Sequence, residues 1–540
     1  MRRLAHGSLP ALFCSLDAMQ PEASLAKKRR TWPWLGILGV VALFVALRWN
    51  SFNAPLIRDE GEYAYSARLL IQGVAPYEHS FIQKPPMVIY SYAFASLCFP
   101  KIFWAPRLLA IFFVALATAL LGYAARLEFG QRVAWWAMCL MTPLVLMPGV
   151  DQFTANTEMF MLLPLLAMVA VYVRSRGEAR QTRYWLAAGC LAATTLLYKY
   201  TALPVAAFLF LFWSVELWRG TRKMNLIWRC WLAAWLGAMA AGGLELGYFL
   251  ARDGGAHLWE CTVLFNRYYA ATNNFNLAYL WMRLGIFWQA WWILFLVPLA
   301  IFLRPPKHIW FWVGLLISAL IATNASGYGQ YYVVAMPFWA MLAAVGIHML
   351  GGWLGRWVRW AEGLIMIAVM LLVLRPDVPW LLCSPERFTA AKMDGFPFAG
   401  SMMTALRVAA LSSPDDFVFV AGSEPQILCY AGRFSPTRFI TAYAMMIPTP
   451  VAQKYQEEAI HDLLARPPKL IVFTTVPNSW LRQAATPADF SDFLGHLLRQ
   501  DYVLVGGHLS GGQNGRWVEP LTSNEMAGAD LWLYQRRLEK

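Results

Sequence analysis

The sequence predicts a polytopic α-helical membrane protein with about eleven spans, outer surface helices and a C-terminal soluble α/β domain. Hydrophobic residues make up 59% of the 540-residue chain and charged residues only 14%, whereas a soluble protein of this size carries far more charge. Apolar runs of roughly 17–23 residues recur through the first two thirds of the chain. After them, short strand-like and helix-like patterns alternate, which is typical of a small α/β fold.

The charge balance does not indicate a nucleic-acid partner. The formal net charge is +14, but the arginines and lysines cluster in short loops between apolar runs. Basic residues in such loops set the orientation of membrane helices and mark the cytoplasmic side. Composition therefore predicts contact with membrane lipids and no binding of nucleic acid.

Residues 1–32 are predicted to form a cytoplasmic N-terminal tail. Their apolar stretch is short and is interrupted by Asp17, so it does not read as a signal peptide. The basic cluster at 27–30 directly precedes the first apolar run, 33–49, and favours a cytoplasmic N-terminus. A start at Met19 would keep the same cluster.

A short apolar run at residues 86–99 decides the topology of everything after it. It has about 14 residues, which makes it one of the shortest apolar runs and shorter than the roughly 17–25 residues that usually cross a bilayer. If it crossed, the basic loops at 174–183, 219–223 and 304–307 would lie outside the cytoplasm, against the positive-inside tendency. We therefore predict that it lies on the outer surface, within a transmembrane module over residues 33–375. The later spans are predicted at 105–125, 133–147, 159–173, 184–197, 202–218, 231–250, 284–303, 309–323, 331–350 and 361–374.

This topology places segments 53–104, 148–158 and 251–283 and the C-terminal part outside the cytoplasm. Residues 376–540 are predicted to be an extracytoplasmic α/β domain, with strands at 417–420, 470–473, 502–505 and 531–534 and helices at 451–465 and 488–500. No GxGxxG follows a strand, so there is no nucleotide-binding fingerprint. Cys261, Cys383 and Cys429 face the same compartment, which leaves a disulfide between two of them open.

Acidic residues at the outer boundary are the first candidates for chemistry. Asp59 and Glu60 follow the first span, and Glu158 ends the next outer loop just before a span. Each taken alone favours a plain helix cap, because a carboxylate near a helix N-terminus is stabilised by the helix dipole. Acids in two outer loops, both at the bilayer surface, fit one common cavity better than separate caps.

Cations are predicted on the same side, where the positive-inside tendency disfavours them. Lys84 opens the surface helix, Lys199 ends a span at its outer face, and Arg267 lies in a long outer loop. The alternatives without a function are that Lys84 extends to lipid headgroups and that Arg267 is a solvated loop residue. Together they indicate a site for an anionic headgroup. Tyrosines are expected as further donor contacts at Tyr63, Tyr331 and Tyr332.

These residues resemble a known family. The Asp59-Glu60 pair, the Lys84-Pro85-Pro86 turn and the Asn156-Thr157-Glu158 stretch are similar to motifs of the family-C membrane glycosyltransferases. Within that superfamily the chain looks like the protein O-mannosyltransferases and the bacterial aminoarabinose transferase of lipid A. The resemblance covers roughly residues 33–350.

The resemblance implies a sugar donor linked to polyprenyl phosphate, used on the extracytoplasmic face of the bacterial inner membrane. Asp59 matches the loop acid that activates the acceptor hydroxyl, and Lys84, Lys199 and Arg267 look like phosphate contacts. Glu158 aligns with an acid that is often Asp in relatives. The acceptor is a protein, a lipid or a glycan, and the sugar a hexose or a pentose.

The expected chemistry is an inverting transfer that needs no metal and no cofactor beyond the donor. The cations stabilise the leaving phosphate and Asp59 takes the acceptor proton, while Glu60 and Glu158 orient the acceptor or the sugar. A polytopic transporter or glycolipid flippase is the alternative. Transporters place ionisable groups near the bilayer midplane within repeated halves, and neither feature is visible here. A membrane-anchored binding protein is a third class, but the C-terminal domain shows no recognisable constellation for it.

Overall fold

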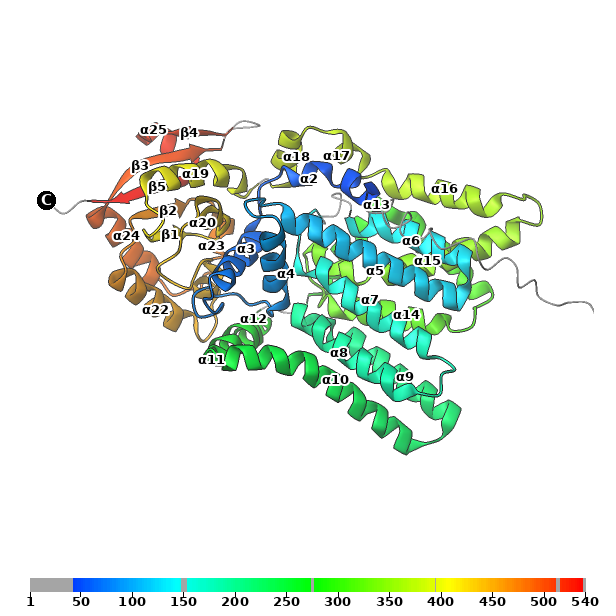
Figure 1. Ribbon diagram of the computed structural model, residues 1–540. Helices are drawn as coiled ribbons and strands as arrows, with labels where there is room; N and C mark the ends of the chain where they lie inside the picture. The colour runs from blue at the N-terminus through cyan, green and yellow to red at the C-terminus, as the bar shows by residue number, and fades with distance from the viewer. Residues whose placement is uncertain (1–41, 147–152, 273–275, 394, 511–514, 538–540) are drawn as a thin grey trace, which may run out of the picture.

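The computed structural model describes residues 42–146, 153–272, 276–393, 395–510 and 515–537. A helical module and a C-terminal α/β lobe lie side by side, and α3 (Arg58–Ile71) and α4 (Met87–Cys98) lie where the two meet (Figure 1). The N-terminal tail and most of the predicted span at 33–49 lie outside the described residues.

The chain is a polytopic membrane protein. Among the described residues, 6 helices are long and apolar enough to cross a membrane, and four further apolar helices are shorter. Each predicted span from residue 105 onward coincides with a helix. These are α5 (Ala105–Phe129), α6 (Gln131–Leu146), α7 (Thr157–Ser175), α8 (Gln181–Tyr198), α9 (Leu203–Thr221), α10 (Met224–Leu250), α13 (Leu277–Leu296) continued by η4 (Val297–Leu303), α14 (Ile309–Ala322), α15 (Met336–Leu354) and α16 (Ala361–Leu374).

The short helix α4 agrees in length with a surface position. Its 12 residues extend over about 18 Å at 1.5 Å per residue, well short of the roughly 30 Å hydrocarbon layer. Tyr92 and Val88 are buried against the protein, whereas Phe94 and Leu97 are exposed. Its placement at the outer surface of the membrane stays a prediction.

The C-terminal lobe is built on a five-stranded mixed sheet in the order β1-β2-β5-β3-β4. The strands are β1 (Val418–Ala421), β2 (Leu470–Thr474), β3 (Tyr502–Leu509), β4 (Arg516–Val518) and β5 (Ala529–Arg536). β1 and β2 are parallel, whereas β5 runs antiparallel to both β2 and β3. α19 (Phe398–Leu411) and α24 (Asp489–Asp501) pack on the sheet, and α22 (Ala452–Ala465) packs on α24. The four predicted strands and both predicted helices coincide with elements of this lobe, whereas β4 and α19 were not predicted.

The lobe does not close its core without α3. Tyr65 and Leu69 of α3 belong to the same buried apolar cluster as strand residues Val420, Val472 and Leu533. The backbone N–H of Ser435 donates to the Tyr65 hydroxyl at 3.0 Å, and Arg68 donates to the carbonyl of Gly432 at 2.8 Å. The sequence boundary at residue 375 therefore does not separate two independent packing units.

The cysteines proposed as disulfide partners are free. Cys261 is buried in η3 (Glu260–Leu264), and Cys383 and Cys429 are partly buried. The Cys429 thiol instead contacts the carbonyl oxygen of Gly61 at 3.3 Å. Within the described chain no bridge joins any of these three residues, since Cys261, Cys383 and Cys429 pack in three separate apolar clusters.

Gly61 lets α3 approach α20 (Gln426–Ala431) very closely. A Cβ at Gly61 would lie 2.5 Å from the Gln426 amide nitrogen and 2.9 Å from its Cα, both backbone atoms that cannot rotate away. We expect Gly61→Ala to lower the stability of the full-length protein in detergent by about 2–3 kcal/mol, measured by thermal unfolding. Gly243→Ala in α10 is the matched control, since a Cβ added there would meet no heavy atom of the described chain within 4 Å. Equal stabilities of the two variants would contradict the close packing.

Candidate functional site

The helix α3 presents its acidic residues at its first turn. It begins at Arg58, after an extended Ile57, and Asp59 and Glu60 both lie in the first turn. The backbone N–H of Ile57 donates to Glu60 Oε2 at 3.2 Å, so Glu60 caps the helix that it begins. The capping alternative is therefore right for Glu60.

Glu60 also forms a buried ion pair that occupies both of its oxygens. Arg107, near the start of α5, donates through Nε to Glu60 Oε1 at 2.8 Å and through Nη2 to Oε2, and the Ala155 N–H donates to Oε1 at 2.8 Å. The side chains are 1% and 0% exposed. The expectation that Glu60 orients the acceptor or the sugar is wrong for this geometry, since no oxygen is left to contact a substrate. Glu60 instead fixes α3 to α5.

Asp59, the neighbouring carboxylate, is partly exposed. Within the part of the chain that the structure describes, it makes no hydrogen bond and no ion pair. Its charge nevertheless acts on Glu62, Tyr63 and Lys84, which lie around it. An accessible carboxylate of this kind is available to accept a proton from a substrate.

Lys84 lies where the charges of Asp59 and Glu158 act on it, and its side chain is largely buried. A hydrogen bond inside its own loop holds the backbone of Lys84, since the Tyr77 hydroxyl donates to the Lys84 carbonyl at 2.9 Å. Burial alone would lower the pKa of the Lys84 ammonium, but Tyr331 and the carboxylates of Asp59 and Glu158 raise it above its ordinary value. Lys84 therefore keeps its positive charge at neutral pH, as a phosphate contact requires.

A second cation is held by Glu158 and Tyr331. Glu158, in the first turn of α7, forms an ion pair with Lys199, which directly follows α8, and both side chains are less than a tenth exposed. The Lys199 ammonium lies 3.2 Å from the ring centroid of Tyr331 in η5 (Gly329–Val334). The structure thus brings these three predicted residues together, and Glu158 is a direct partner of a lysine.

Glu62 belongs to the same group and was not predicted. It lies one turn after Asp59 on α3 and is 2% exposed. Burial, together with the adjacent Asp59 charge, raises the pKa of Glu62 to about 8, although the Lys84 charge and hydrogen bonding from Tyr443 lower it. Its spacing of three residues from Asp59 was a usable signal. Its hydrogen-bond partner Tyr443 in the lobe is 381 residues away, and no local sequence pattern could indicate that contact.

Three further predicted residues differ in where they lie. Tyr63 is fully buried beside Tyr92, with ring centroids 5.4 Å apart, and its hydroxyl has no hydrogen-bond partner among the described residues. Tyr332 donates to the Ser326 carbonyl at 3.1 Å, so its hydroxyl stabilises the local chain. Arg267 is exposed on α12 (Phe265–Thr272), and the structure does not bring it into contact with either lysine.

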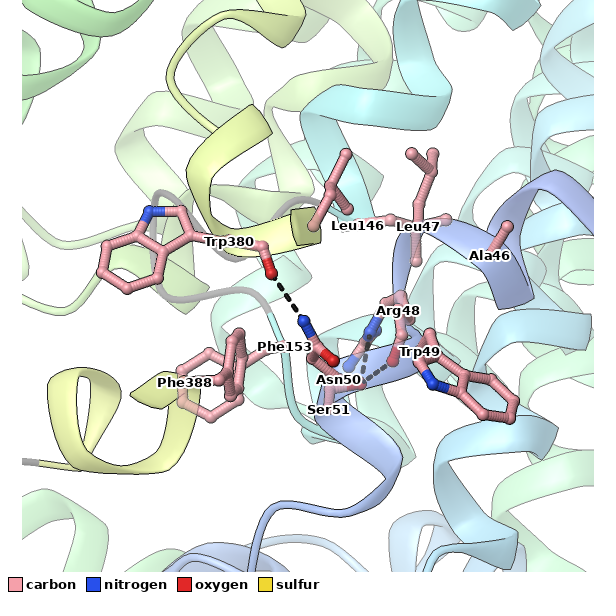
Figure 2. Close-up of a pocket in the computed structure, with 11 residues that line it drawn as sticks. Ala46, Leu47, Arg48, Trp49, Asn50, Ser51, Leu146, Phe153, Trp380 and Phe388 are labelled. Atoms are coloured by element: carbon pink, nitrogen blue, oxygen red, sulfur yellow. Dashed lines mark hydrogen bonds between the residues drawn. The ribbon is translucent and has the colours of Figure 1, made fainter. Parts of the chain in front are cut away.

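A small pocket lies at the end of the first span (Figure 2). Arg107, the partner of Glu60, donates to the carbonyl of Ser51 in the pocket lining. Asn50 donates to the Trp380 carbonyl at 2.8 Å and to the Cys383 carbonyl at 2.9 Å, which joins this span to α17 (Val378–Leu382) and the turn after it. Arg48 is buried in the pocket wall and donates to Ser51 Oγ at 3.4 Å. These hydrogen bonds hold the segment that leads into α3.

The described residues hold no group of three or more His, Cys, Asp or Glu side chains suited to a metal ion. The metal-independent mechanism stays a prediction. The arrangement around Asp59 has an accessible carboxylate and buried ammonium groups, which is a set of groups for proton transfer next to an anion.

Residues 83–241 match the family model described as dolichyl-phosphate-mannose-protein mannosyltransferase. The chain is also similar to ArnT from Cupriavidus metallidurans bound to undecaprenyl phosphate, with a TM-score of 0.58 and 15% identity over 91% of this chain and 98% of that one. The apo state of the same ArnT gives a TM-score of 0.49 and 14% identity, covering 90% and 97%. An Archaeoglobus fulgidus oligosaccharyltransferase tethered with an acceptor peptide gives 0.49 and 13%, covering 91% and 74%. No curated protein matches the chain significantly.

Proposed function

We propose that this chain, which has the fold of the family-C membrane glycosyltransferases, moves a sugar from a polyprenyl-phosphate-linked donor to an acceptor hydroxyl on the extracytoplasmic face of the bacterial inner membrane. The observation that carries the proposal is that one site contains both an accessible carboxylate, Asp59, and the buried and charged Lys84. The first suits a general base and the second a leaving phosphate.

The proposed reaction is a single displacement at the anomeric carbon. The acceptor oxygen forms a bond to that carbon while the bond between the carbon and the phosphate oxygen breaks, and the electron pair leaves with the polyprenyl phosphate. Asp59 takes the proton of the acceptor hydroxyl as its oxygen attacks. Attack from the face opposite the leaving phosphate inverts the configuration of the sugar.

Lys84 and Lys199 are the proposed phosphate contacts, with Arg267 as a third cation from α12. The negative charge of the leaving phosphate is stabilised by ammonium groups that are already fixed in place, which costs no reorganisation during the reaction. Glu158 and Tyr331 hold Lys199 in position for this role. In this proposal Lys84, Lys199 and Arg267 supply the electrostatic stabilisation without a metal or another cofactor.

The donor class is supported by the shared fold. The ArnT structure that this chain resembles over most of its length is bound to undecaprenyl phosphate, the carrier part of such a donor. The membrane-embedded fold of this chain suits a long lipid carrier. The proposed acceptor is a hydroxyl of a protein, a lipid or a glycan, and the proposed sugar is a hexose or a pentose.

The test is turnover by the purified full-length protein in nanodiscs of bacterial polar lipids. A panel of radiolabelled polyprenyl-phosphate hexoses and pentoses is supplied together with a membrane extract that contains acceptors. We expect one donor to release polyprenyl phosphate and its label to appear in an acceptor. Movement of label across the bilayer with the donor intact would support the flippase alternative. Absence of cleavage for every donor, by protein that unfolds cooperatively, would contradict the proposal.

A further inference from the structure

The Tyr443 hydroxyl contacts two segments of the candidate site at once. Tyr443 begins α21 (Tyr443–Met446) in the C-terminal lobe and is 5% exposed. Its hydroxyl donates to Glu62 Oε1 at 2.9 Å and accepts the backbone N–H of Gln83 at 3.2 Å. One side chain of the lobe therefore joins α3 to the loop before α4.

These two segments carry the groups that the proposed reaction must hold at a set separation. Glu62 lies one helical turn from Asp59, and Gln83 directly precedes Lys84. A displacement of Tyr443 would therefore move the base relative to the phosphate contact. Small errors in such a separation are costly, because the reacting atoms must be within near-contact distance.

The ring of Tyr443 is held independently of its hydroxyl. It packs 6.3 Å from the Phe81 ring and 5.9 Å from the Phe265 ring, measured between centroids. Beside it, the Phe81 N–H donates to the Arg438 carbonyl at 2.6 Å. Removal of the hydroxyl alone would leave this aromatic packing in place, which separates the hydrogen bonds from the fold.

The charges around Glu62 determine how its hydrogen bond with Tyr443 affects the proposed reaction. The groups that face it are Asp59 and Arg58 on its own helix, Lys84 on the loop, and the hydroxyls of Thr441 and Tyr443 in the lobe. With Glu62 neutral, the carboxylates of Asp59 and Glu158 balance the ammonium groups of Lys84 and Lys199. An ionised Glu62 would add a negative charge next to Lys84 and repel the donor phosphate.

We propose that Tyr443 is a positioning residue for the transfer: its hydroxyl, through Glu62 and the Gln83 amide, fixes Asp59 relative to Lys84. The C-terminal lobe thereby completes the catalytic arrangement of the transmembrane module. The inference rests on the proposed function and assigns a role to the lobe in the chemical step.

The test compares wild type, Tyr443→Phe and the control Tyr502→Phe in the donor assay. Tyr502 is a buried tyrosine at the start of β3 in the same lobe, and its hydroxyl donates at 2.6 Å to the carbonyl of Pro468, just before β2 and away from α3. We expect Tyr443→Phe to lower kcat about tenfold with little change in KM for the donor, and Tyr502→Phe to keep the wild-type rate. A wild-type kcat for Tyr443→Phe would overturn the inference.

The pH profile separates positioning from a general loss of structure. The raised pKa of Glu62 means that its proton is held at neutral pH and is lost as the pH rises through about 8, so wild-type activity should fall there. The Tyr443 hydrogen bond lowers that pKa, so Tyr443→Phe should shift the fall to higher pH, and Glu62→Gln should remove it. A reduced kcat with an unmoved pH profile would indicate structural damage only and would overturn the inference.

The two proposals fail in different ways. No cleavage by the wild type overturns the proposed function and this inference together. Cleavage by the wild type with an unaltered Tyr443→Phe variant overturns the inference alone. The pH dependence of thermal stability, compared between wild type and Glu62→Gln, reports the Glu62 titration without any need for turnover.

Discussion

Asp59→Asn is expected to lower kcat for sugar transfer by about 10²–10⁴-fold, the range in which a positioned general base contributes. The amide has nearly the same size as the carboxylate but cannot accept the acceptor proton. Because Asp59 is partly exposed and makes no hydrogen bond or ion pair among the described residues, the substitution should leave the fold and the donor affinity nearly unchanged. The measurement is single-turnover release of polyprenyl phosphate.

Asp253→Asn is the matched control for this substitution. Asp253 is an exposed residue in the turn after α10, with a φ of 56°, a conformation that Asn adopts readily. It should keep the wild-type rate and the wild-type thermal midpoint. If folded Asp59→Asn protein turned over donor as fast as this control, Asp59 would not be the base.

Glu60→Gln is expected to lower the free energy of unfolding by about 3–5 kcal/mol, although Glu60 is the direct neighbour of Asp59. The substitution removes the counter-charge of Arg107, whose side chain is 1% exposed and cannot return to water. Arg107 also donates to the carbonyls of Ala54 and Pro55 at 2.8 Å. A change of its rotamer would break these hydrogen bonds to the segment that leads into α3. Thermal unfolding in detergent measures the loss.

The control for Glu60→Gln is Glu178→Gln. Glu178 pairs with Arg174 at the surface in an i,i+4 arrangement, with side chains 31% and 48% exposed. Such pairs contribute little, so the control should change stability by less than about 1 kcal/mol. Equal effects of the two substitutions would mean that the buried pair does not anchor α3.

The membrane class and most elements could be predicted from the sequence because their signals are local. Unbroken apolar runs such as 105–125 predict helices, since a backbone in lipid must satisfy its own hydrogen bonds. Runs rich in Val, Ile and Phe, such as 470–473, predict buried strands. β4 was missed because its three residues give too short a pattern to detect. The resemblance to family-C glycosyltransferases agrees with the fold found.

The sequence by itself determined that acidic residues and a lysine follow the first apolar run within one short stretch, 58–84. It distinguished Asp59 from Glu60 only through a family resemblance and did not single out Glu62, because neighbouring carboxylates on one helix are chemically alike. Tertiary structure decided among them: Arg107 of α5 neutralises Glu60, Tyr443 of the lobe binds Glu62, and Asp59 is left accessible. The physical reason is that burial and hydrogen-bond partners set the charge and availability of a carboxylate, and here these partners come from distant parts of the chain.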